Sequence, residues 1–436
     1  MSELAGVDLW GTRIGAVLLE PGARAAVFQY ESNFLFSGIE VSPITMPLSN
    51  TRYTFPGLGY EAFRGLPGLL ADSLPDKFGR ALIRAWLATQ GRTFDSFSPI
   101  EQLCHVGARG AGALEYRPMI NPVGHAQPLQ VADLVGLANE ILAQKADLHA
   151  SFASDERKAA LARILQTSSS AGGARAKAVI AWNPQTQEVR SGQADAPEGF
   201  EHWLLKFDGV DANRNDESRD PLADPLGYTV AEYVYSLMAR NAGIQMSDCR
   251  LLEEGGRRHF MTRRFDRTGA TGKLHMQTLG GLAHMDFNEP QGNTYETAFD
   301  VLHRLKLGTK AAEQLYRRML FNVISHNHDD HVKNIAFLMD RSGTWQLAPA
   351  YDLAYNYNPK GWTREHQMSI NGKRDDFTRE DFAVITRAAR IPVPAAKESF
   401  DAVRSAVSQW DQLAGQHEVP KALAKRISAG LRLDIR

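Results

Sequence analysis

Asn327-His328-Asp329-Asp330-His331-Val332-Lys333-Asn334 is the stretch that decides the fold we expect, together with Asp352 eighteen residues beyond its end. Asp329 and Asn334 are five residues apart, so one short loop can aim a carboxylate at a substrate and an amide oxygen at a metal ion. Asp330 competes for the carboxylate role, and counting back from Asn334 favours Asp329. The pattern predicts phosphoryl-transfer chemistry, which needs a carboxylate near the attacking hydroxyl and oxygen ligands for Mg²⁺.

The residues that follow this loop strengthen the prediction. The five-residue separation is that of the Asp and Asn in the protein-kinase catalytic loop H-R-D-x-x-x-x-N. Asp352 ends a predicted β-hairpin over Asn334–Leu353, where a second metal-binding carboxylate belongs, in the role of the Asp of D-F-G. The letters here are Tyr351-Asp352-Leu353, so the position fits while D-F-G is absent. We expect Lys333 to offset charge on the transferring phosphoryl group.

Two upstream segments offer what a nucleotide needs. Lys206 lies in the apolar run Trp203–Phe207, where burying an ammonium is costly unless it is paired. We expect its partners to be nucleotide phosphates and Glu232, near the start of the helix predicted over Thr229–Ala242. The segment Ser168–Lys177 precedes a strand, and its small residues allow backbone N–H groups to approach phosphate closely. It is not a Walker A motif, because the GK[ST] ending is missing.

Several of these residues also fit roles that have nothing to do with phosphoryl transfer. His326, His328 and His331 alternate with the two aspartates in a spacing that offers ligands to a transition metal, although H-E-x-x-H is absent. Lys206 also fits a lysine of an edge strand with its amine in solvent. Glu232 can be a solvated residue favoured by the helix dipole.

Two further segments have ordinary structural interpretations. The glycine-rich Gly107–Ala113 has no following helix signature and no basic partner, so we interpret it as a structural turn. The polar stretch Asp208–Gly227 is predicted to be an exposed, mobile loop.

The whole chain predicts an α+β protein with two lobes of the protein-kinase type, a β-rich N-terminal part and a mostly helical C-terminal lobe, and the nucleotide in the cleft. We place the units at 1–118, 119–264 and 265–436. Helical periodicity marks the last unit at Ala311–Asn327, Arg379–Ala389 and Ala395–Ala414.

Composition sets broad limits on the class of protein. The 436 residues are 43% hydrophobic and 23% charged, which is ordinary for a globular protein, and the formal net charge of −1 does not indicate nucleic acid or an anionic membrane. Cys104 and Cys249 are far apart and match no metal-ligand spacing, so we expect reduced thiols and a cytoplasmic location. No basic n-region precedes an apolar run, and no stretch approaches the roughly 18 apolar residues of a membrane helix.

These motifs together resemble the HipA family of serine/threonine kinase toxins from bacterial toxin–antitoxin modules. The likeness spans nearly the whole chain. Four of the segments that carry it, AEYVYSLMARNAGI, FMTRRFDR, DDHVKN and LAPAYDLA, are specific in their order and spacing. The glycine-rich segments resemble the branch typified by YjjJ more than HipA itself. The segments that carry the resemblance are GLLADSLPDKFGRALI, GARGAGALEY, SSSAGGARAK, HWLLKFDG, AEYVYSLMARNAGI, FMTRRFDR, DDHVKN and LAPAYDLA.

The resemblance implies a role for each site residue. Asp329 is the expected proton acceptor, Asn334 and Asp352 are the expected Mg²⁺ ligands, and Lys206 is expected on the nucleotide phosphates. The family hinge commonly has Glu where this chain has Arg263, which matters little if the backbone contacts the adenine. The other residues implied at the nucleotide are Gly172, Gly173, Ala174, Arg175, Ala176 and Lys177 of the phosphate loop, Arg263, Arg264, Phe265 and Asp266 of the hinge, and His331, Lys333 and Tyr351.

The resemblance also implies regulation, because the family is known for inhibitory autophosphorylation of a serine in the phosphate loop. Ser170 is the closest match when counted back from Lys177, and Ser169 matches if the double glycine is an insertion. A phosphate there brings roughly two negative charges into the space that the ATP phosphates need.

The function implied is an ATP- and Mg²⁺-dependent kinase that inhibits growth by phosphorylating a translation component, such as an aminoacyl-tRNA synthetase. The implied partner is a helix-turn-helix antitoxin of the HipB type, and the chain's near-neutral charge predicts DNA contact only through that partner. One alternative is a small-molecule or lipid kinase on the same scaffold. Another is a pseudokinase that serves as a binding module, against which the intact Lys206, Asp329, Asn334 and Asp352 argue.

Overall fold

The computed structural model describes residues 3–120, 129–143, 161, 164–165, 175–193, 196–210, 226–269 and 271–436. Ser169, Ser170, Gly172, Gly173 and Ala174 of the predicted phosphate loop lie outside the described residues, as does most of the polar loop predicted over 208–227. No helix in the described part of the chain is both long and apolar enough to cross a membrane.

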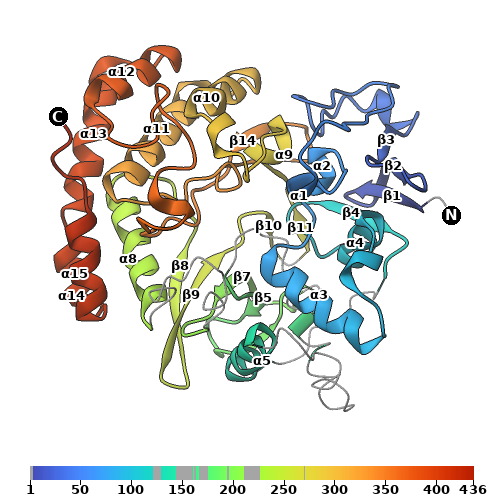
Figure 1. The fold of residues 1–436 in the computed structure, drawn as a ribbon, viewed down its shortest axis with the longest axis horizontal. Helices are drawn as coiled ribbons and strands as arrows, with labels where there is room; N and C mark the ends of the chain where they lie inside the picture. Colours follow the sequence, from blue (N-terminus) through green and yellow to red (C-terminus); the bar gives the residue numbers. More distant parts are fainter. Residues whose placement is uncertain are drawn as a thin grey trace.

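The N-terminal unit is built on a four-stranded antiparallel sheet at one end of the molecule (Figure 1). The strand order is β3-β2-β1-β4, so β4 pairs with β1 although about a hundred residues separate them in sequence. Four α-helices lie between β3 and β4 in the sequence. The elements are β1 (Glu3–Leu9), β2 (Thr12–Leu19), β3 (Val27–Tyr30), α1 (Tyr60–Phe63), α2 (Gly68–Ala71), α3 (Lys77–Thr89), α4 (Pro99–Val106) and β4 (Leu114–Arg117).

A five-stranded antiparallel sheet forms the middle of the molecule, with the order β6-β5-β7-β9-β8. β7 is its central strand, and Lys206 is paired with Lys177 on one side and Phe260 on the other. This placement excludes the edge-strand alternative for Lys206. The elements are α5 (Val131–Ala143), β5 (Lys177–Trp182), β6 (Val189–Ser191), β7 (Glu201–Lys206), α8 (Tyr228–Asn241), β8 (Cys249–Glu254) and β9 (Arg257–Arg263).

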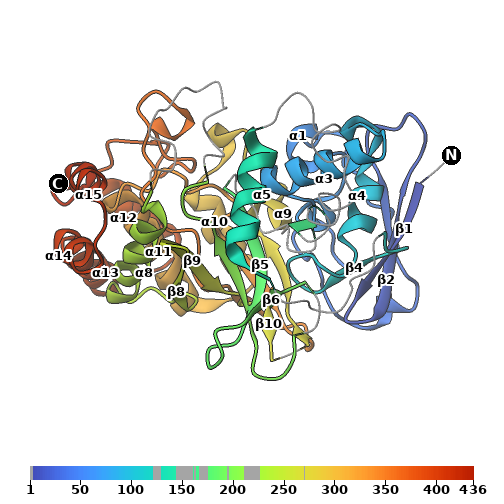
Figure 2. The same cartoon turned by 90° about the horizontal axis from the view of Figure 1, so that it is seen from below.

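The cores of these units overlap in one place. α3 belongs to the first unit in sequence, but Phe78, Leu82 and Ile83 pack in one apolar cluster with α5 and with β5 and β7. Seen at 90° to the first view, α5 lies over the sheet, and α3 lies between α5 and the N-terminal sheet (Figure 2). The domain boundaries 1–118, 119–264 and 265–436 stay a prediction, and α3 ties the first two units together.

The C-terminal lobe is mostly helical and contains a small three-stranded sheet, β12-β13-β14, which packs against the N-terminal unit through Met339 and Trp345. The hairpin predicted before Asp352 is β13 with β14, and β12 extends it on the other side. The protein is therefore α+β with two lobes, as the sequence predicts. The elements are β12 (His275–Thr278), α9 (Leu279–Ala283), α10 (Tyr295–Arg304), α11 (Gly308–Ile324), β13 (Ala336–Met339), β14 (Trp345–Leu347), α12 (Arg379–Ala388), α13 (Val393–Val407), α14 (Trp410–Gln416) and α15 (Lys421–Gly430).

Two helix predictions were wrong in their limits. The helix predicted over Ala395–Ala414 is two helices, because α13 ends at Val407 and the chain turns so that Trp410 is fully buried and donates to the Ala424 carbonyl (3.1 Å). The helix predicted to reach Asn327 ends at Ile324, and His326 has a φ of 61° that no right-handed helix allows.

The contact between the N-terminal unit and the C-terminal lobe can be tested through its effect on stability. A Cβ on Gly68 of α2 would lie 2.1 Å from the carbonyl oxygen of Gly281 in α9. We expect Gly68→Ala to lower the free energy of unfolding by about 1–3 kcal/mol, the usual cost of overpacking. Gly57→Ala is the control, because its Cβ would meet no atom within 4 Å. Guanidinium unfolding curves that move equally for both variants would contradict this close approach.

Candidate active site

A cleft of about 1080 Å³ brings together residues of the five-stranded sheet, the N-terminal unit and the C-terminal lobe. This is the size of a cleft that encloses most of a small-molecule ligand. The predicted site residues that line it are Arg175, Lys177, Lys206, Asp329, His331, Lys333, Tyr351 and Asp352.

Lys206 lines this cleft and joins three elements of the fold. Its Nζ is 2.5 Å from Glu232 Oε1 on α8 and 2.5 Å from Asp352 Oδ1 after the hairpin. Burial lowers the pKa of Lys206, but Asp352 and Glu232 more than offset this, so the pKa lies above its ordinary value. Burial raises the pKa of Asp352, and Lys206 and Lys177 hold it well below its ordinary range. The ammonium and this carboxylate are therefore both charged.

The end of the predicted phosphate loop adds two more cations. Arg175 Nη1 is 3.6 Å from Glu232 Oε2, and its guanidinium lies over the Tyr228 ring at 3.8 Å. Lys177 Nζ is 3.1 Å from Asp76 Oδ2, and both side chains are only 3% exposed. Ala176, between the two cations, is buried.

Asp76 was missed by the sequence reasoning. It caps α3 by accepting a hydrogen bond from the Gly79 N–H (2.7 Å) and also pairs with Lys177. Asp72 was missed as well. It lines the cleft and accepts hydrogen bonds from the Thr278 N–H (2.7 Å) and hydroxyl (2.8 Å).

The structure separates the two aspartates of the catalytic loop, and Asp330 is the structural one. Its Oδ2 accepts a hydrogen bond from the Tyr295 hydroxyl (3.0 Å) and lies 2.9 Å from His366 Nδ1, and its Oδ1 accepts from the Gln367 N–H (2.7 Å). Burial raises the pKa of Asp330, but His366 and these hydrogen bonds bring it below the ordinary value. With both oxygens in use, this carboxylate anchors the loop.

Asp329 is the aspartate that lines the cleft. Its Oδ2 accepts a hydrogen bond from Asn356 Nδ2 (3.1 Å), and its Oδ1 lies 3.3 Å from His331 Nε2. Burial raises its pKa to about 6, His331 opposes the rise and Asp352 adds to it. A carboxylate with this pKa can take a proton near neutral pH, as a general base must.

Asn334 lies behind Asp329, in a small cavity that Asp352 also lines. Its Nδ2 donates to the Asp329 carbonyl (2.7 Å), which leaves the amide oxygen as the atom that can face a metal ion. Asp352 has a φ of 56°, a backbone conformation that L residues rarely adopt and that is often found at functional sites.

Lys333 and Tyr351 form the opposite side of the loop. Lys333 Nζ lies 4.4 Å from the centre of the Phe287 ring, and burial lowers its pKa while Asp72 opposes that shift. The Tyr351 hydroxyl donates to the Lys333 carbonyl (2.5 Å), and its ring packs on Phe265 at 5.4 Å.

His326 and His328 do not form a transition-metal site. The His326 ring stacks on Tyr357 at 4.2 Å, and His328 Nδ1 lies 3.1 Å from the Thr363 carbonyl. Burial lowers the pKa of His326 to about 3 and of His328 to about 2, so both rings are neutral. Among residues that the structure describes, no group of three His, Cys, Asp or Glu side chains is arranged to hold a metal ion.

The predicted hinge residues do not bring their side chains into the cleft with Lys206. Arg263 is half exposed and pairs with Glu201 (3.5 Å) and Asp248 (3.7 Å). Arg264 Nη2 is 2.7 Å from Asp266 Oδ2, and both are nearly buried. Phe265 packs on Tyr351, so any hinge contact with an adenine would come from the backbone.

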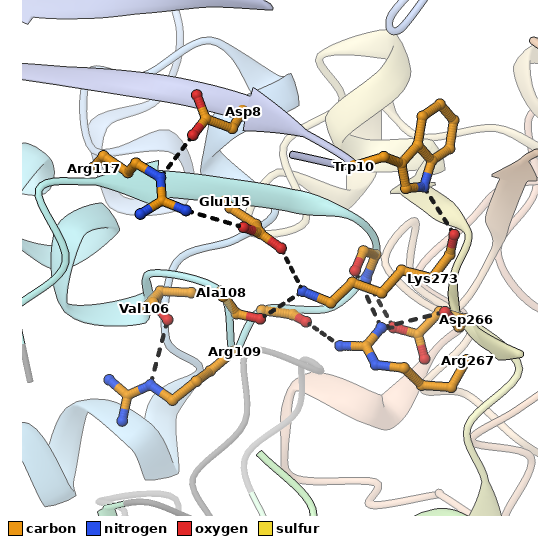
Figure 3. Close-up of polar contacts among 12 residues, drawn as sticks. Asp8, Trp10, Val106, Ala108, Arg109, Glu115, Arg117, Asp266, Arg267 and Lys273 are labelled. Carbon is orange, nitrogen blue, oxygen red and sulfur yellow. Dashed lines mark hydrogen bonds and ion pairs between the residues drawn. The ribbon is translucent and has the colours of Figure 1, made fainter. Parts of the chain in front are cut away.

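The glycine-rich segment interpreted as a turn clamps this hinge, as Figure 3 shows. Asp266 Oδ2 accepts from the Gly112 N–H (2.8 Å), and Arg267 donates to the carbonyls of Gly110 (3.0 Å) and Gly112 (3.1 Å). Lys273 donates to the Ala108 carbonyl (3.0 Å). The segment is a turn, and its contacts join the N-terminal unit to the hinge.

The same network continues into the N-terminal sheet (Figure 3). Lys273 Nζ lies 2.8 Å from Glu115 of β4, whose neighbour Arg117 pairs with Asp8 of β1 at 2.8 Å. Trp10 donates its indole N–H to the Lys273 carbonyl (2.8 Å). Charged side chains therefore link the predicted hinge region to the N-terminal sheet.

Comparison with known proteins places the chain in a family. The model of the HipA N-terminal domain matches residues 5–117, and the model of the HipA-like C-terminal domain matches residues 169–410, more than half of the chain. The chain belongs to the HipA family.

Two relatives illustrate how far the similarity extends. Putative kinase Y4mE of Sinorhizobium fredii (strain NBRC 101917 / NGR234) is 26% identical over 144 residues, which are 31% of this chain and 34% of that protein, so the match spans about a third of the relative. HipA of Shewanella oneidensis MR-1 was solved in complex with HipB and operator DNA. It superposes with a TM-score of 0.67 over 98% of this chain and 94% of its own, at 15% identity, and so shows the same fold.

The contrast between the two aspartates predicts opposite effects on stability. The pKa of Asp330 is lowered on folding, so it stabilises the protein above about pH 4, and Asp330→Asn should lower the free energy of unfolding at pH 7.5 by about 3 kcal/mol. The pKa of Asp329 is raised to about 6, so its charge destabilises the protein above that pH. Asp329→Asn should therefore raise the free energy of unfolding at pH 7.5 by about 1–3 kcal/mol.

The pH dependence separates the two cases. The advantage of Asp329→Asn should shrink between pH 7.5 and pH 5, because the parent carboxylate takes up its proton in that range. Urea unfolding at the two pH values measures this. A loss of stability for Asp329→Asn equal to that of Asp330→Asn would contradict the assignment.

Proposed function

We propose that this HipA-family protein is an ATP- and Mg²⁺-dependent protein serine/threonine kinase. The observation that carries the proposal is the buried Lys206, bridged between Glu232 and Asp352 in a cleft that Asp329 also lines. A lysine held by a helix glutamate, with a metal-binding carboxylate beside it, is the arrangement that protein kinases require for transfer. The relative Y4mE, whose name describes a putative kinase, supports the same activity.

The residues present fit a nucleotide. Lys177 and Lys206 face each other across β5 and β7, and Arg175 lies at the start of that strand pair. These three cations are the groups that we propose meet the phosphate oxygens. The proposed phosphate loop runs from Gly172 to Lys177, and the proposed hinge contact is made by the backbone between Arg263 and Asp266.

The donor set also fits Mg²⁺, which prefers oxygen ligands. Asp352 is 28% exposed and directs one oxygen to Lys206, and Asn334 keeps its amide oxygen after its nitrogen bonds to the loop. We propose that these two residues hold the ion. When bound, Mg²⁺ neutralises charge on the phosphate oxygens.

The proposed reaction is a single phosphoryl transfer. Asp329 accepts the proton of a seryl or threonyl hydroxyl, and the hydroxyl oxygen forms a bond to the γ-phosphorus. The bond from that phosphorus to the bridging oxygen breaks, and its electron pair leaves with ADP. Lys333, on the same loop, balances charge on the group in transfer, and His331 lines the nucleotide site.

The cellular role proposed here follows the family. We propose a toxin that inhibits growth by phosphorylating a translation component, such as an aminoacyl-tRNA synthetase, in the cytoplasm. Its proposed partner is a helix-turn-helix antitoxin of the HipB type, which would bring the complex to DNA; the relative from Shewanella oneidensis was solved in such a complex. Phosphorylation of Ser170 or Ser169 is the proposed means of self-inactivation.

Removing the proposed base tests the activity directly. Asp329→Asn should reduce transfer of labelled phosphate from ATP to protein by about 10²–10⁴-fold, the usual contribution of a general base, while ATP binding is retained. Asp340→Asn is the control, because Asp340 lies in the exposed turn of the hairpin and bonds to Ser342. Label that enters a small acceptor or lipid instead of protein would contradict the protein-kinase assignment, and transfer by Asp329→Asn at the parent rate would contradict the role of Asp329.

A further inference from the structure

The segment from Tyr355 to Tyr357 runs beside the catalytic loop without being part of the predicted motif. The Asn356 N–H donates to the His326 carbonyl (3.3 Å), and the His328 N–H donates to the Asn356 carbonyl (3.0 Å). These two bonds form a parallel bridge between Asn327 and Asn356. The backbone of Asn356 is therefore fixed on the loop from both sides.

The rings of the H-x-H pair, which the proposed chemistry does not use, support the same segment. Tyr357 stacks on His326 with ring centres 4.2 Å apart and an angle of 22°, and it meets His328 edge-on at 5.3 Å. On its other side His328 packs against His366 at 4.1 Å, and His366 binds the structural carboxylate of Asp330. The histidines thus pack the segment onto the loop.

The side chain of Asn356 reaches the proposed base. Its Nδ2 donates to Asp329 Oδ2 at 3.1 Å, and Asn356 is half-buried in the wall of the cleft. Asp329 Oδ1 is buried and has no hydrogen-bond partner among the described residues, and the nitrogen His331 Nε2 lies 3.3 Å from it. The two oxygens of one carboxylate are therefore in different situations.

We propose that Asn356 is a positioning residue that binds Asp329 Oδ2 and so fixes the orientation of the carboxylate that accepts the proton of the acceptor hydroxyl. This rests on the proposed function and adds a residue that the kinase motif does not contain. Rotation of the carboxylate about its Cβ–Cγ bond would break the Asn356 hydrogen bond, so the amide holds one orientation. A small misorientation of a catalytic group lowers the rate without weakening the binding of a substrate that the group does not hold.

Three substitutions test the proposal. Asn356→Ala removes the donor, and Asn356→Asp replaces it with a like charge of the same shape. Both should lower kcat by about 10–100-fold while the KM for ATP stays within about twofold of the parent. Asn356→Gln keeps an amide donor and should recover part of the loss. Asn183→Ala is the control, since Asn183 Oδ1 accepts from the Gln185 N–H (2.9 Å) in a turn that does not line the cleft.

The outcomes separate this proposal from the proposed function. A kcat of Asn356→Ala and Asn356→Asp within threefold of the parent overturns it, as does a loss matched by an equal rise in the KM for ATP or a fall in Tm. If the parent itself transfers no phosphate, the proposed function fails, and a crystal structure of Asn356→Ala decides the positioning role alone. The proposal expects the Asp329 carboxylate to turn or to occupy two conformers there; an unchanged single conformer contradicts it.

Discussion

The structure depends on one buried cation, the ammonium of Lys206. Its strand is the central one of the five-stranded sheet, so the chain cannot move the lysine to solvent. Burying an ammonium without partners costs several kcal/mol, and here the partners come from two other parts of the fold. Glu232 stands on α8 and Asp352 follows the β13–β14 hairpin. Each element must therefore be in place for the cation to be stable, which couples the sheet to the C-terminal lobe.

The partners of a buried charge also distinguish the two aspartates of the predicted catalytic loop. Asp330 has both of its oxygens bonded, to Tyr295, His366 and Gln367, and such a buried network fixes one conformation. Asp329 faces the cleft with a raised pKa, which costs stability and suits a group that must exchange a proton. The loop therefore places an anchoring carboxylate next to the proposed base. Asp266 is anchored in the same way, because it accepts a hydrogen bond from the Gly112 N–H and forms buried ion pairs with Arg264 and Arg267.

Much of this arrangement could be predicted from the sequence, because it rests on local patterns. The count from Asn334 selected Asp329, and the apolar run around Lys206 with the helix that follows indicated the pair with Glu232. What could not be predicted depends on contacts between distant segments. Asp76 meets Lys177 about a hundred residues away, and no periodicity indicates that contact. Asn356 has the sequence context of an ordinary loop residue, and only the bonds of its backbone to His326 and His328 show its place beside Asp329.

We propose that this cleft binds MgATP through Lys206. Isothermal titration of ATP, with and without Mg²⁺, into the parent and into Lys206→Met tests it most directly. The account predicts binding that Mg²⁺ strengthens in the parent, and that weakens at least about tenfold in Lys206→Met, because one charge-assisted contact to phosphate is worth about 1.5–3 kcal/mol. Equal affinity in the two proteins, or no effect of Mg²⁺ on the parent, would contradict it.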